Sequence, residues 1–352
     1  MSLKSILIAV DKFPTSFGHS TVINELSLKL QENGFKVSIG AFTFAEEPPK
    51  NIEKILLNKT KMLFSKKNDL KFDIIHLHQP KMTYFFLFNK NRTPIILHYH
   101  GSSNFIQRLN FKISMRLFSK KISKIIPVSY TALNQIKTMS KKLPPVKVVF
   151  NGVDYNFFND NRSQQFKIGT PQLIFVGGLR EYKKINELID AMPKLLLKYP
   201  KANLQIIGEG SEYSKLNKII NEKKLEKSVE LIGKQNRHQI SLRLSSADIY
   251  VSASRFETFS LSPLEAMASG LPVVLSEHPA HKELIEKSNA GKIFSYDNTS
   301  ELCIKIEEVF ENKEDFSIKA KNFSSNNDWK YVTRQITEIY QEVFDDYNIR
   351  YD

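Results

Sequence analysis

Two carboxylates, Glu257 and Glu265, stand eight residues apart in the segment 255–272, which reads RFETFSLSPLEAMASGLP. Between them lies a Ser-rich turn that opens a helix, and Gly270 and Pro272 close that helix. A helix N-terminus has free backbone N–H groups and is a ready site for an anion. A carboxylate on each side would hold the hydroxyl groups of a ligand whose middle is a diphosphate.

The same segment also has an interpretation without a ligand. Ser262 followed by Glu265 is a capping box, with Pro263 at the first helical position and Gly270 at the C-cap. Glu257 is the charge that capping does not require. If all eight steps were helical, the two carboxylates would lie roughly 12 Å apart. Paired glycosidase carboxylates lie about 5–9.5 Å apart, so the spacing favours two separate ligand contacts over a hydrolase.

The segment resembles the E-x7-E motif of retaining family-4 glycosyltransferases, the glycosyl transferases group 1. That resemblance implies the GT-B fold: an α/β chain with two facing Rossmann-like domains, parallel sheets and a C-terminal helix that crosses back onto the first domain. It also implies a hexosyltransferase whose co-substrate is a nucleotide-diphosphate sugar, UDP-glucose by default, and which requires no metal cofactor. The chain contains no D-x-D motif, which agrees with metal-independent transfer.

Strand and helix patterns alternate along both halves of the chain, which predicts α/β domains with parallel sheets. Residues 155–171 are polar and lack periodicity, and we expect the linker there. The predicted domains are residues 1–160 with the helix 329–352, for the acceptor, and residues 161–328, for the nucleotide-sugar. The predicted strands are 5–10, 36–42, 73–78, 94–100, 124–129 and 146–151 in the first domain, and 172–178, 203–210, 228–233, 249–254, 271–276 and 291–294 in the second.

The resemblance assigns donor-binding roles in the second domain. FVGGLREYKKI (175–185) is similar to the family's V-G-R-L-x-x-x-K-G, with Lys183 at the Lys position and Gly178 where relatives have Arg. Lys183 would neutralise the leaving diphosphate, helped by Arg180 two residues beyond the missing Arg. An alternative is a basic solvated helix start, although cations there are unfavourable without an anion. The complete implied donor set is Gly18, Gly177, Gly178, Arg180, Lys183, Glu257, Ser260, Leu261 and Glu265, with Glu265 on the ribose and Glu257 on the sugar.

The catalytic set implied by the resemblance is Glu257, His100 and Lys183. His100 follows a strand and matches the family's histidine beside the transferred sugar, and Gly18 belongs to the loop after the first strand. His100 could instead be a neutral histidine whose hydrogen bonds are satisfied locally, and Gly18 could be an ordinary residue of a strand-to-helix turn. His76 and His78 alternate on one strand and share a face, but no Cys or carboxylate pair completes a zinc set, and we expect no metal site. Gly208-Glu209-Gly210 is no dinucleotide fingerprint, because Tyr213 occupies the third Gly position.

Basic charge is concentrated in the first half of the chain. Residues 1–165 hold 25 Lys and Arg against 10 Asp and Glu, whereas residues 166–352 hold 26 against 27. Such asymmetry indicates an anionic partner for the first half. Within residues 105–124 one stripe is basic and another is apolar (Ile106, Leu109, Ile113 and Leu117). This pattern is typical either of a helix at an anionic membrane surface or of a helix packed on the sheet with a solvated basic face. In the first interpretation, the face toward the membrane or acceptor comprises Arg108, Lys112, Arg116, Lys120 and Lys124.

Composition limits the remaining classes. The single cysteine, Cys303, excludes an internal disulfide, and no apolar run of about 18 residues is long enough for a membrane span. The start MSLK leads directly into a strand, so we expect no signal peptide and a cytoplasmic protein, peripheral at the inner face of the membrane. The acceptor is expected to be a glycan, lipid-linked, in surface-polysaccharide or N-glycan assembly. The alternatives are a catalytically weak sugar-nucleotide-binding relative, an epimerase or phosphorylase on the same fold, and a nucleic-acid-binding protein, for which the chain lacks a known RNA motif.

Overall fold

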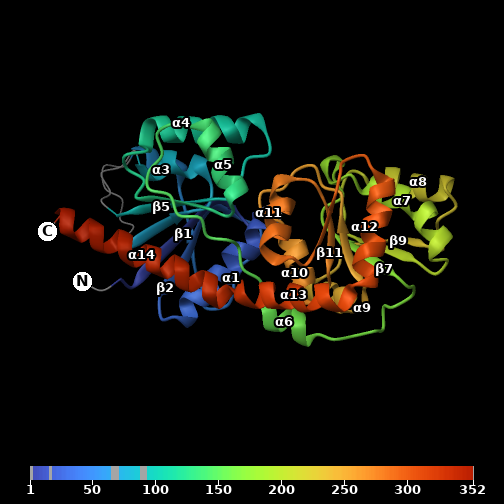
Figure 1. The fold of residues 1–352 in the computed structure, drawn as a ribbon. Coiled ribbons are helices and arrows are strands. Elements are labelled where there is room, and N and C mark those ends of the chain that lie inside the picture. The colour runs from blue at the N-terminus through green and yellow to red at the C-terminus, as the bar shows by residue number, and fades with distance from the viewer. Residues whose placement is uncertain (1–2, 16–17, 65–70, 88–92, 352) are drawn as a thin grey trace. The chain divides into compact units, whose positions relative to one another are not determined.

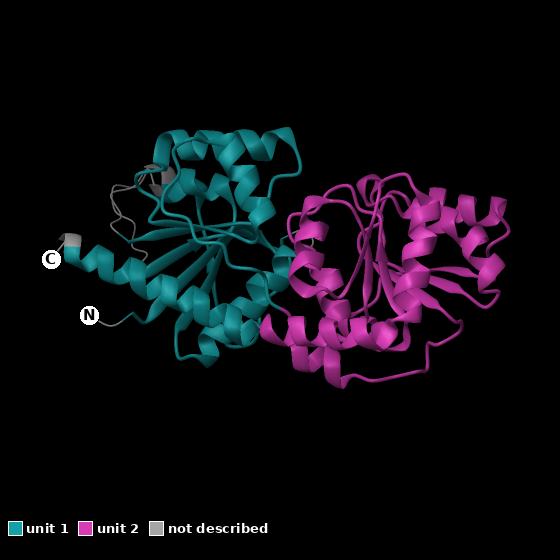
Figure 2. Cartoon of the chain, viewed as in Figure 1, with its two compact units in different colours: residues 1–152, 329–352 teal, residues 153–328 magenta. Residues whose placement is uncertain are grey.

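The computed structural model describes residues 3–15, 18–64, 71–87 and 93–351. Its chain forms two compact units, residues 1–152 with 329–352 (unit 1) and residues 153–328 (unit 2) (Figure 2). Each unit contains a six-stranded sheet in which all neighbouring strands are parallel. The α/β fold with two Rossmann-like sheets, predicted from the alternation of strands and helices, is confirmed.

Unit 1 has the strand order β3-β2-β1-β4-β5-β6. Figure 1 shows α3, α4 and α5 on one side of this sheet and α14 on the other, where α14 contacts α1. The strands are β1 (Ser5–Phe13), β2 (Lys36–Phe44), β3 (Glu53–Leu56), β4 (Ile74–Leu77), β5 (Ile95–Tyr99) and β6 (Lys124–Pro127). The helices are α1 (His19–Glu32), α2 (Lys59–Phe64), α3 (Thr83–Leu87), α4 (Phe105–Phe118), α5 (Tyr130–Met139) and α14 (Trp329–Tyr351), with a 3-10 turn at Pro80–Met82.

The last helix returns to the first unit, as predicted. Gly152 is the last residue of the first segment of unit 1, and Trp329 is the first residue of its second segment. These two residues are in contact. A Cβ at Gly152 would be 2.7 Å from the Trp329 ring. Trp329 is buried, so the return of the chain is fixed by a packed aromatic side chain.

Unit 2 has the strand order β12-β11-β10-β7-β8-β9. Its strands are β7 (Gln172–Val176), β8 (Asn203–Ile207), β9 (Val229–Gly233), β10 (Ile249–Ser252), β11 (Val273–Ser276) and β12 (Gly291–Phe294). Its helices are α6 (Tyr155–Asp160), α7 (Ile185–Lys198), α8 (Tyr213–Glu222), α9 (Arg237–Ser246), α10 (Leu261–Ala268), α11 (Pro279–Ser288), α12 (Thr299–Glu311) and α13 (Lys313–Asn326), with a 3-10 turn at Glu181–Lys183.

β7 shows why its sequence forms a central strand. Successive strand residues point to opposite faces of the sheet. Leu173 and Phe175 pack into a core with α7, α8 and α12, while Ile174 and Val176 pack into a second core with α10. A continuous apolar run is typical of a parallel strand that is covered on both faces.

Three expected boundaries differ from the structure. β3, which the sequence analysis did not identify, is mostly exposed and lacks alternation. The predicted strand 146–151 forms only an isolated bridge, Ile125 with Val146. The units divide at residues 152 and 153, rather than at 160 and 161, because residues 155–160 form α6, which packs against α9 and α10 of unit 2.

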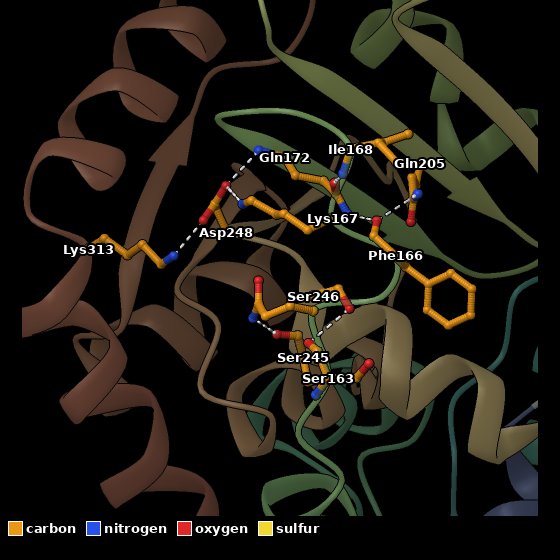
Figure 3. A network of polar contacts seen from close by, with 11 residues as sticks. Ser163, Phe166, Lys167, Ile168, Gln172, Gln205, Ser245, Ser246, Asp248 and Lys313 are labelled. Carbon is orange, nitrogen blue, oxygen red and sulfur yellow. Dashed lines mark hydrogen bonds and ion pairs between the residues drawn. The ribbon is translucent and has the colours of Figure 1, made fainter.

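The segment expected to be a linker is fastened to unit 2 by a buried carboxylate, Asp248 (Figure 3). Asp248 accepts a hydrogen bond of 2.7 Å from the backbone N–H of Gln172 and forms ion pairs with Lys167 and Lys313. Burial alone would raise the pKa of Asp248, but these hydrogen bonds outweigh it and hold the pKa below its ordinary value. Residues 163–172 are therefore part of the folded unit.

Candidate active site

Unit 2 has a topological switch point between β7 and β10. These strands are neighbours, yet the chain proceeds outward from β7 through β8 and β9 and from β10 through β11 and β12. In open α/β sheets, ligands bind at the carboxyl ends of the two strands at such a point. Lys183 follows β7 and Glu257 follows β10, so two residues chosen from sequence motifs lie on the loops that this rule selects.

Lys183 and Glu257 form an ion pair in which Nζ lies 2.5 Å from Oε1. Their side chains are only 18% and 14% exposed, so water screens the pair weakly. Burial tends to raise the pKa of Glu257. The electrostatic effects of Lys183 and His281 and the hydrogen bonds from Lys183 and Ser254 outweigh burial, so the pKa of Glu257 lies below its ordinary value. The loops after β7 and β10 thus hold an ammonium group and a carboxylate together.

The loop after β7 lies directly against the loop after β8. Gly208 has φ of +144°, and a Cβ there would lie 1.9 Å from the carbonyl oxygen of Gly177. Gly210 has φ of +159°, and its Cβ would lie 2.2 Å from the carbonyl oxygen of Leu179. Only glycine permits so close an approach. The contact between the two loops fixes the backbone of residues 177–179, which precede Lys183 in the chain.

α10 begins next to Glu257. The structure corrects the predicted capping box: the helix starts at Leu261 with Ser260 as N-cap, so Pro263 is the third helical residue and not the first. Ser260 makes no side-chain capping bond, and its buried Oγ has no hydrogen-bond partner. The helix ends one residue before the predicted C-cap: Ser269 is the C-cap, and Gly270, with φ of +86°, follows it in the left-handed conformation.

Glu265 lies half-buried on α10. Burial raises the pKa of Tyr250, and the carboxylates of Glu257 and Glu265 raise it further. Both carboxylates therefore act on the same buried phenol, whose hydroxyl donates a 3.2 Å hydrogen bond to the carbonyl oxygen of Val176. The two acidic residues of the motif share one neighbourhood at the end of β10.

Sequence reasoning missed Arg255. Its guanidinium contacts Glu187 and Asp297, each at 2.6 Å, and its backbone N–H donates a 2.7 Å hydrogen bond to the carbonyl oxygen of Tyr182. Arg255 thereby joins the loop of Glu257 to the turn of Lys183. Its acidic partners are 68 and 42 residues away in the chain, so no local pattern could indicate the contact.

Two histidines next to Glu257 were also missed. His278 is the N-cap of α11, and its Nδ1 accepts a 3.1 Å hydrogen bond from the backbone N–H of Ala280. Its Nε2 lies 3.4 Å from the backbone nitrogen of Glu257. His281 is fully buried, and burial lowers its pKa to about 4. Neither residue belongs to a motif that was identified in the sequence.

The remaining predicted donor residues lie near Lys183 or in unit 1. Gly177 and Gly178 are half-buried, and Arg180 is exposed at the start of the 3-10 turn that contains Lys183. Gly18 belongs to unit 1, where it precedes α1 with φ of −56°. That backbone conformation is open to any residue, so Gly18 does not owe its identity to a positive φ. Its neighbours 16 and 17 lie outside the described residues.

His100 belongs to a cluster of five histidines in unit 1. His76 and His78 share a face with His98 and His100 because β4 and β5 are paired in parallel register. His19, at the start of α1, contacts His100 with ring centroids 4.6 Å apart. Burial lowers the pKa of His76, His78 and His100 well below the ordinary value, that of His98 to about 3 and that of His19 to about 4, so the imidazoles are neutral.

The predicted basic face does not lie on one helix throughout, because Lys120 and Lys124 are beyond the end of α4. α4 ends at Phe118, and Lys124 instead begins β6, where it is buried and paired with Glu342 of α14. The other four basic residues remain exposed: Arg108, Lys112, Arg116 and Lys120. Within the described residues, no helix is long and apolar enough to span a membrane.

Two family models match consecutive parts of the chain. The model Glycosyltransferase Family 4 matches residues 18–157, and the model Glycosyl transferases group 1 matches residues 156–328. Together with the two Rossmann-like sheets and the Lys183–Glu257 pair, these matches show that the chain belongs to the group 1, family 4 glycosyltransferases of the GT-B fold. It is a retaining hexosyltransferase of the class that uses nucleotide-diphosphate sugars.

Similar proteins include a phosphatidyl-myo-inositol mannosyltransferase from Mycolicibacterium smegmatis. It is 25% identical over 285 residues, which cover 77% of this chain and 72% of the relative. An N-acetyl-alpha-D-glucosaminyl L-malate synthase from Bacillus anthracis is 21% identical over 97% of this chain and 98% of its own. Among solved structures, Anabaena Alr3699/HepE in complex with UDP-glucose has a TM-score of 0.78 at 18% identity, covering 96% of this chain and 99% of that one. At that identity the structure shows the shared fold.

Proposed function

We propose that the chain transfers a hexose, glucose by default, from a UDP-sugar to a lipid-linked glycan acceptor with retention of the anomeric configuration. The observation that carries this proposal is the Lys183–Glu257 pair at the switch point of unit 2, next to the N-terminus of α10. The Anabaena neighbour was solved with UDP-glucose, and the mycobacterial relative is named for a phosphatidyl acceptor. Surface-polysaccharide or N-glycan assembly is the setting that would use such a transfer.

In this proposal the bound donor replaces the ion pair between Lys183 and Glu257 with its own contacts to each residue. The diphosphate competes for the ammonium group of Lys183, and Arg180 adds a second positive charge nearby. The N–H groups at Ser260 and Leu261 receive phosphate oxygens at the helix N-terminus. Glu257, released from Lys183, accepts hydrogen bonds from sugar hydroxyls, and Glu265 accepts those from the ribose.

The transfer step requires the glycosidic bond to the diphosphate to break while the acceptor oxygen attacks on the same face. Negative charge develops on the leaving phosphate, which takes the acceptor proton. Lys183 and the backbone N–H groups stabilise that charge where it forms, and such electrostatic stabilisation is usually the largest contribution to catalysis. His100 is proposed to contact the transferred sugar.

Replacing Glu265 by alanine is expected to weaken the binding of one nucleotide-sugar by about tenfold or more, since each hydrogen bond to a charged group contributes roughly 1.5–3 kcal/mol. Calorimetric titration of a panel of nucleotide-sugars against the wild-type chain identifies the donor, and titration of the variant tests the site. Glu286→Ala, which removes an exposed carboxylate on α11, is the matched control. If no nucleotide-sugar binds to the wild-type chain, the donor assignment is wrong.

The membrane part of the proposal is supported by α4. The helix is anchored by a buried face of Phe111, Ser114, Met115 and Phe118. The apolar stripe found in the sequence points elsewhere: Ile106 and Leu117 are 68% and 56% exposed, and Leu109 and Ile113 are exposed as well. Phe105, at the start of the helix, is 76% exposed. Exposed apolar side chains that alternate with basic ones are typical of a helix at an anionic lipid surface.

The chain is expected to bind vesicles that contain anionic lipid and to bind neutral vesicles far more weakly. Each basic residue near the surface contributes roughly 1 kcal/mol, so Arg108→Gln with Lys112→Gln is expected to lower binding by tenfold or more in a co-sedimentation assay. The control, Lys215→Gln with Lys218→Gln, removes the same charge from exposed positions on α8. Equal binding to anionic and neutral vesicles at moderate salt would contradict the membrane assignment.

A further inference from the structure

Three buried histidines of unit 1 have ring nitrogens without a partner. Nε2 of His76, Nε2 of His78 and both ring nitrogens of His98 make no hydrogen bond, and the three side chains are at most 2% exposed. Buried polar atoms in native proteins nearly always have a partner, and a group of them in one place indicates a water or an ion. One potential ligand atom from each residue lies within 4.8 Å of the others.

The sheet register creates this group. His76 and His78 are two residues apart at the end of β4, and the parallel pairing of Leu77 with Leu97 places His98 of β5 beside His78. The sequence analysis found two ligands on one strand and no third; the structure supplies the third from the neighbouring strand. Imidazole nitrogens are the preferred ligands of zinc after thiolates, and sets of three histidines hold it with one position left open.

The outer contacts match those of metal-binding histidines, which use one ring nitrogen for the ion and the other for a fixed hydrogen-bond partner. Nδ1 of His76 lies 2.6 Å from the hydroxyl of Tyr340 on α14, and Nδ1 of His78 lies 2.9 Å from Nε2 of His100. In both residues the ring nitrogen without a hydrogen-bond partner is Nε2. The two imidazoles are therefore oriented with the same nitrogen left for a ligand.

From these contacts we infer that His76, His78 and His98 form a binding site for a divalent transition metal of the zinc type in unit 1. Zinc binds imidazole nitrogen at about 2.0–2.1 Å, which places the nitrogens of a tetrahedral site roughly 3.4 Å apart. The ligand atoms, which lie within 4.8 Å of one another, must approach by up to about 1.4 Å to reach this spacing, and a movement of His98 would break no hydrogen bond. The ion would join β4 to β5 and, through Tyr340, to α14.

The three proposed ligands belong to unit 1, whereas the charged residues of the proposed donor site belong to unit 2. The ion would stabilise unit 1, and its ligand His78 would keep the 2.9 Å contact of its Nδ1 with Nε2 of His100. Metal binding can therefore be measured on the intact chain without a sugar donor, and its outcome does not depend on the transferase assignment.

The test measures zinc binding by the full chain after removal of metal with a chelator. Calorimetric titration with zinc is expected to give about one ion per chain, and cobalt in its place is expected to give the visible absorption of a tetrahedral site. His98→Phe keeps a planar ring and removes both nitrogens, so binding is expected to fall at least a hundredfold. His238→Phe makes the same change at an exposed position on α9 and is expected to bind as the wild type does.

Two results would overturn the inference: a wild-type chain that binds no stoichiometric zinc, or a His98→Phe variant that binds as tightly as His238→Phe. Should His98→Phe fail to fold, His98→Gln serves in its place, since an amide is a poor zinc ligand. A rise in the melting temperature of the wild type with zinc, absent from the His98 variant, is the second expected readout.

Discussion

Replacing Lys183 by alanine is expected to lower the rate of sugar transfer about 10²–10³-fold, the loss that is typical when one stabilising donor for a developing charge is removed. The expectation follows from the position of Lys183 at the switch point and from its buried pairing with Glu257. The measurement is kcat for transfer from the donor identified by calorimetry, with the acceptor held at saturation.

The variant must be separated from a misfolded one. Removal of Lys183 leaves Glu257, whose side chain is only 14% exposed, without its closest cation, and such an unpaired charge is destabilising. The double variant Lys183→Ala with Glu257→Gln removes that charge, so it is expected to recover thermal stability and remain inactive. Lys282→Ala, at a half-exposed lysine on α11, is the control. Transfer by Lys183→Ala within threefold of the wild-type rate would refute the proposed role.

The same experiment tests the alternative that the chain is a catalytically weak sugar-nucleotide-binding relative. Gly178 stands at the Arg position of the motif that the segment 175–185 resembles, and Arg180 is exposed on the same turn as Lys183. A wild-type chain that binds a nucleotide-sugar but shows no transfer above background would indicate a binding protein. A wild-type rate clearly above that of Lys183→Ala identifies an enzyme whose turn uses Lys183.

Local patterns predicted most of the fold, because a parallel strand covered on both faces needs a continuous apolar run and its crossover helix needs an apolar stripe. β7 has such a run and was identified within two residues. β3 has the exposed sequence Glu53–Leu56 and was missed, since an edge strand is fixed by its neighbour. Residues 146–151 have the apolar pattern but only a single bridge to pair with.

The candidate site divides in the same way. Lys183, Glu257 and Glu265 belong to short motifs with fixed spacing, so they could be found from the sequence. Arg255 and His98 acquire their importance from residues on other strands and loops, which no local pattern reveals. The start of α10 was placed two residues late because Ser262 with Glu265 satisfies a capping box, whereas the structure uses Ser260 and leaves its hydroxyl without a partner.

Replacing Gly208 by alanine is expected to destabilise unit 2 by on the order of 4 kcal/mol, the range seen when a substitution creates strain that the surroundings cannot relieve. A Cβ at this position would lie 1.9 Å from the carbonyl oxygen of Gly177. The obstacle is backbone, which cannot rotate away as a side chain could. The loop after β7 must then move, and with it Gly178 and the turn that carries Lys183.

Gly233 provides the matched control, because it too has a positive φ, +78°, but a Cβ there meets nothing within 4 Å. Gly233→Ala is expected to cost only the left-handed conformation, roughly 1–2 kcal/mol. The two melting temperatures, compared with and without the nucleotide-sugar, separate strain from crowding. If the close approach of the two loops positions Lys183, Gly208→Ala loses most of the stabilisation by donor and Gly233→Ala retains it. Equal effects of the two substitutions would mean that glycine at 208 serves backbone conformation alone, and that the position of the Lys183 turn is set by Arg255 and its contacts with Glu187 and Tyr182.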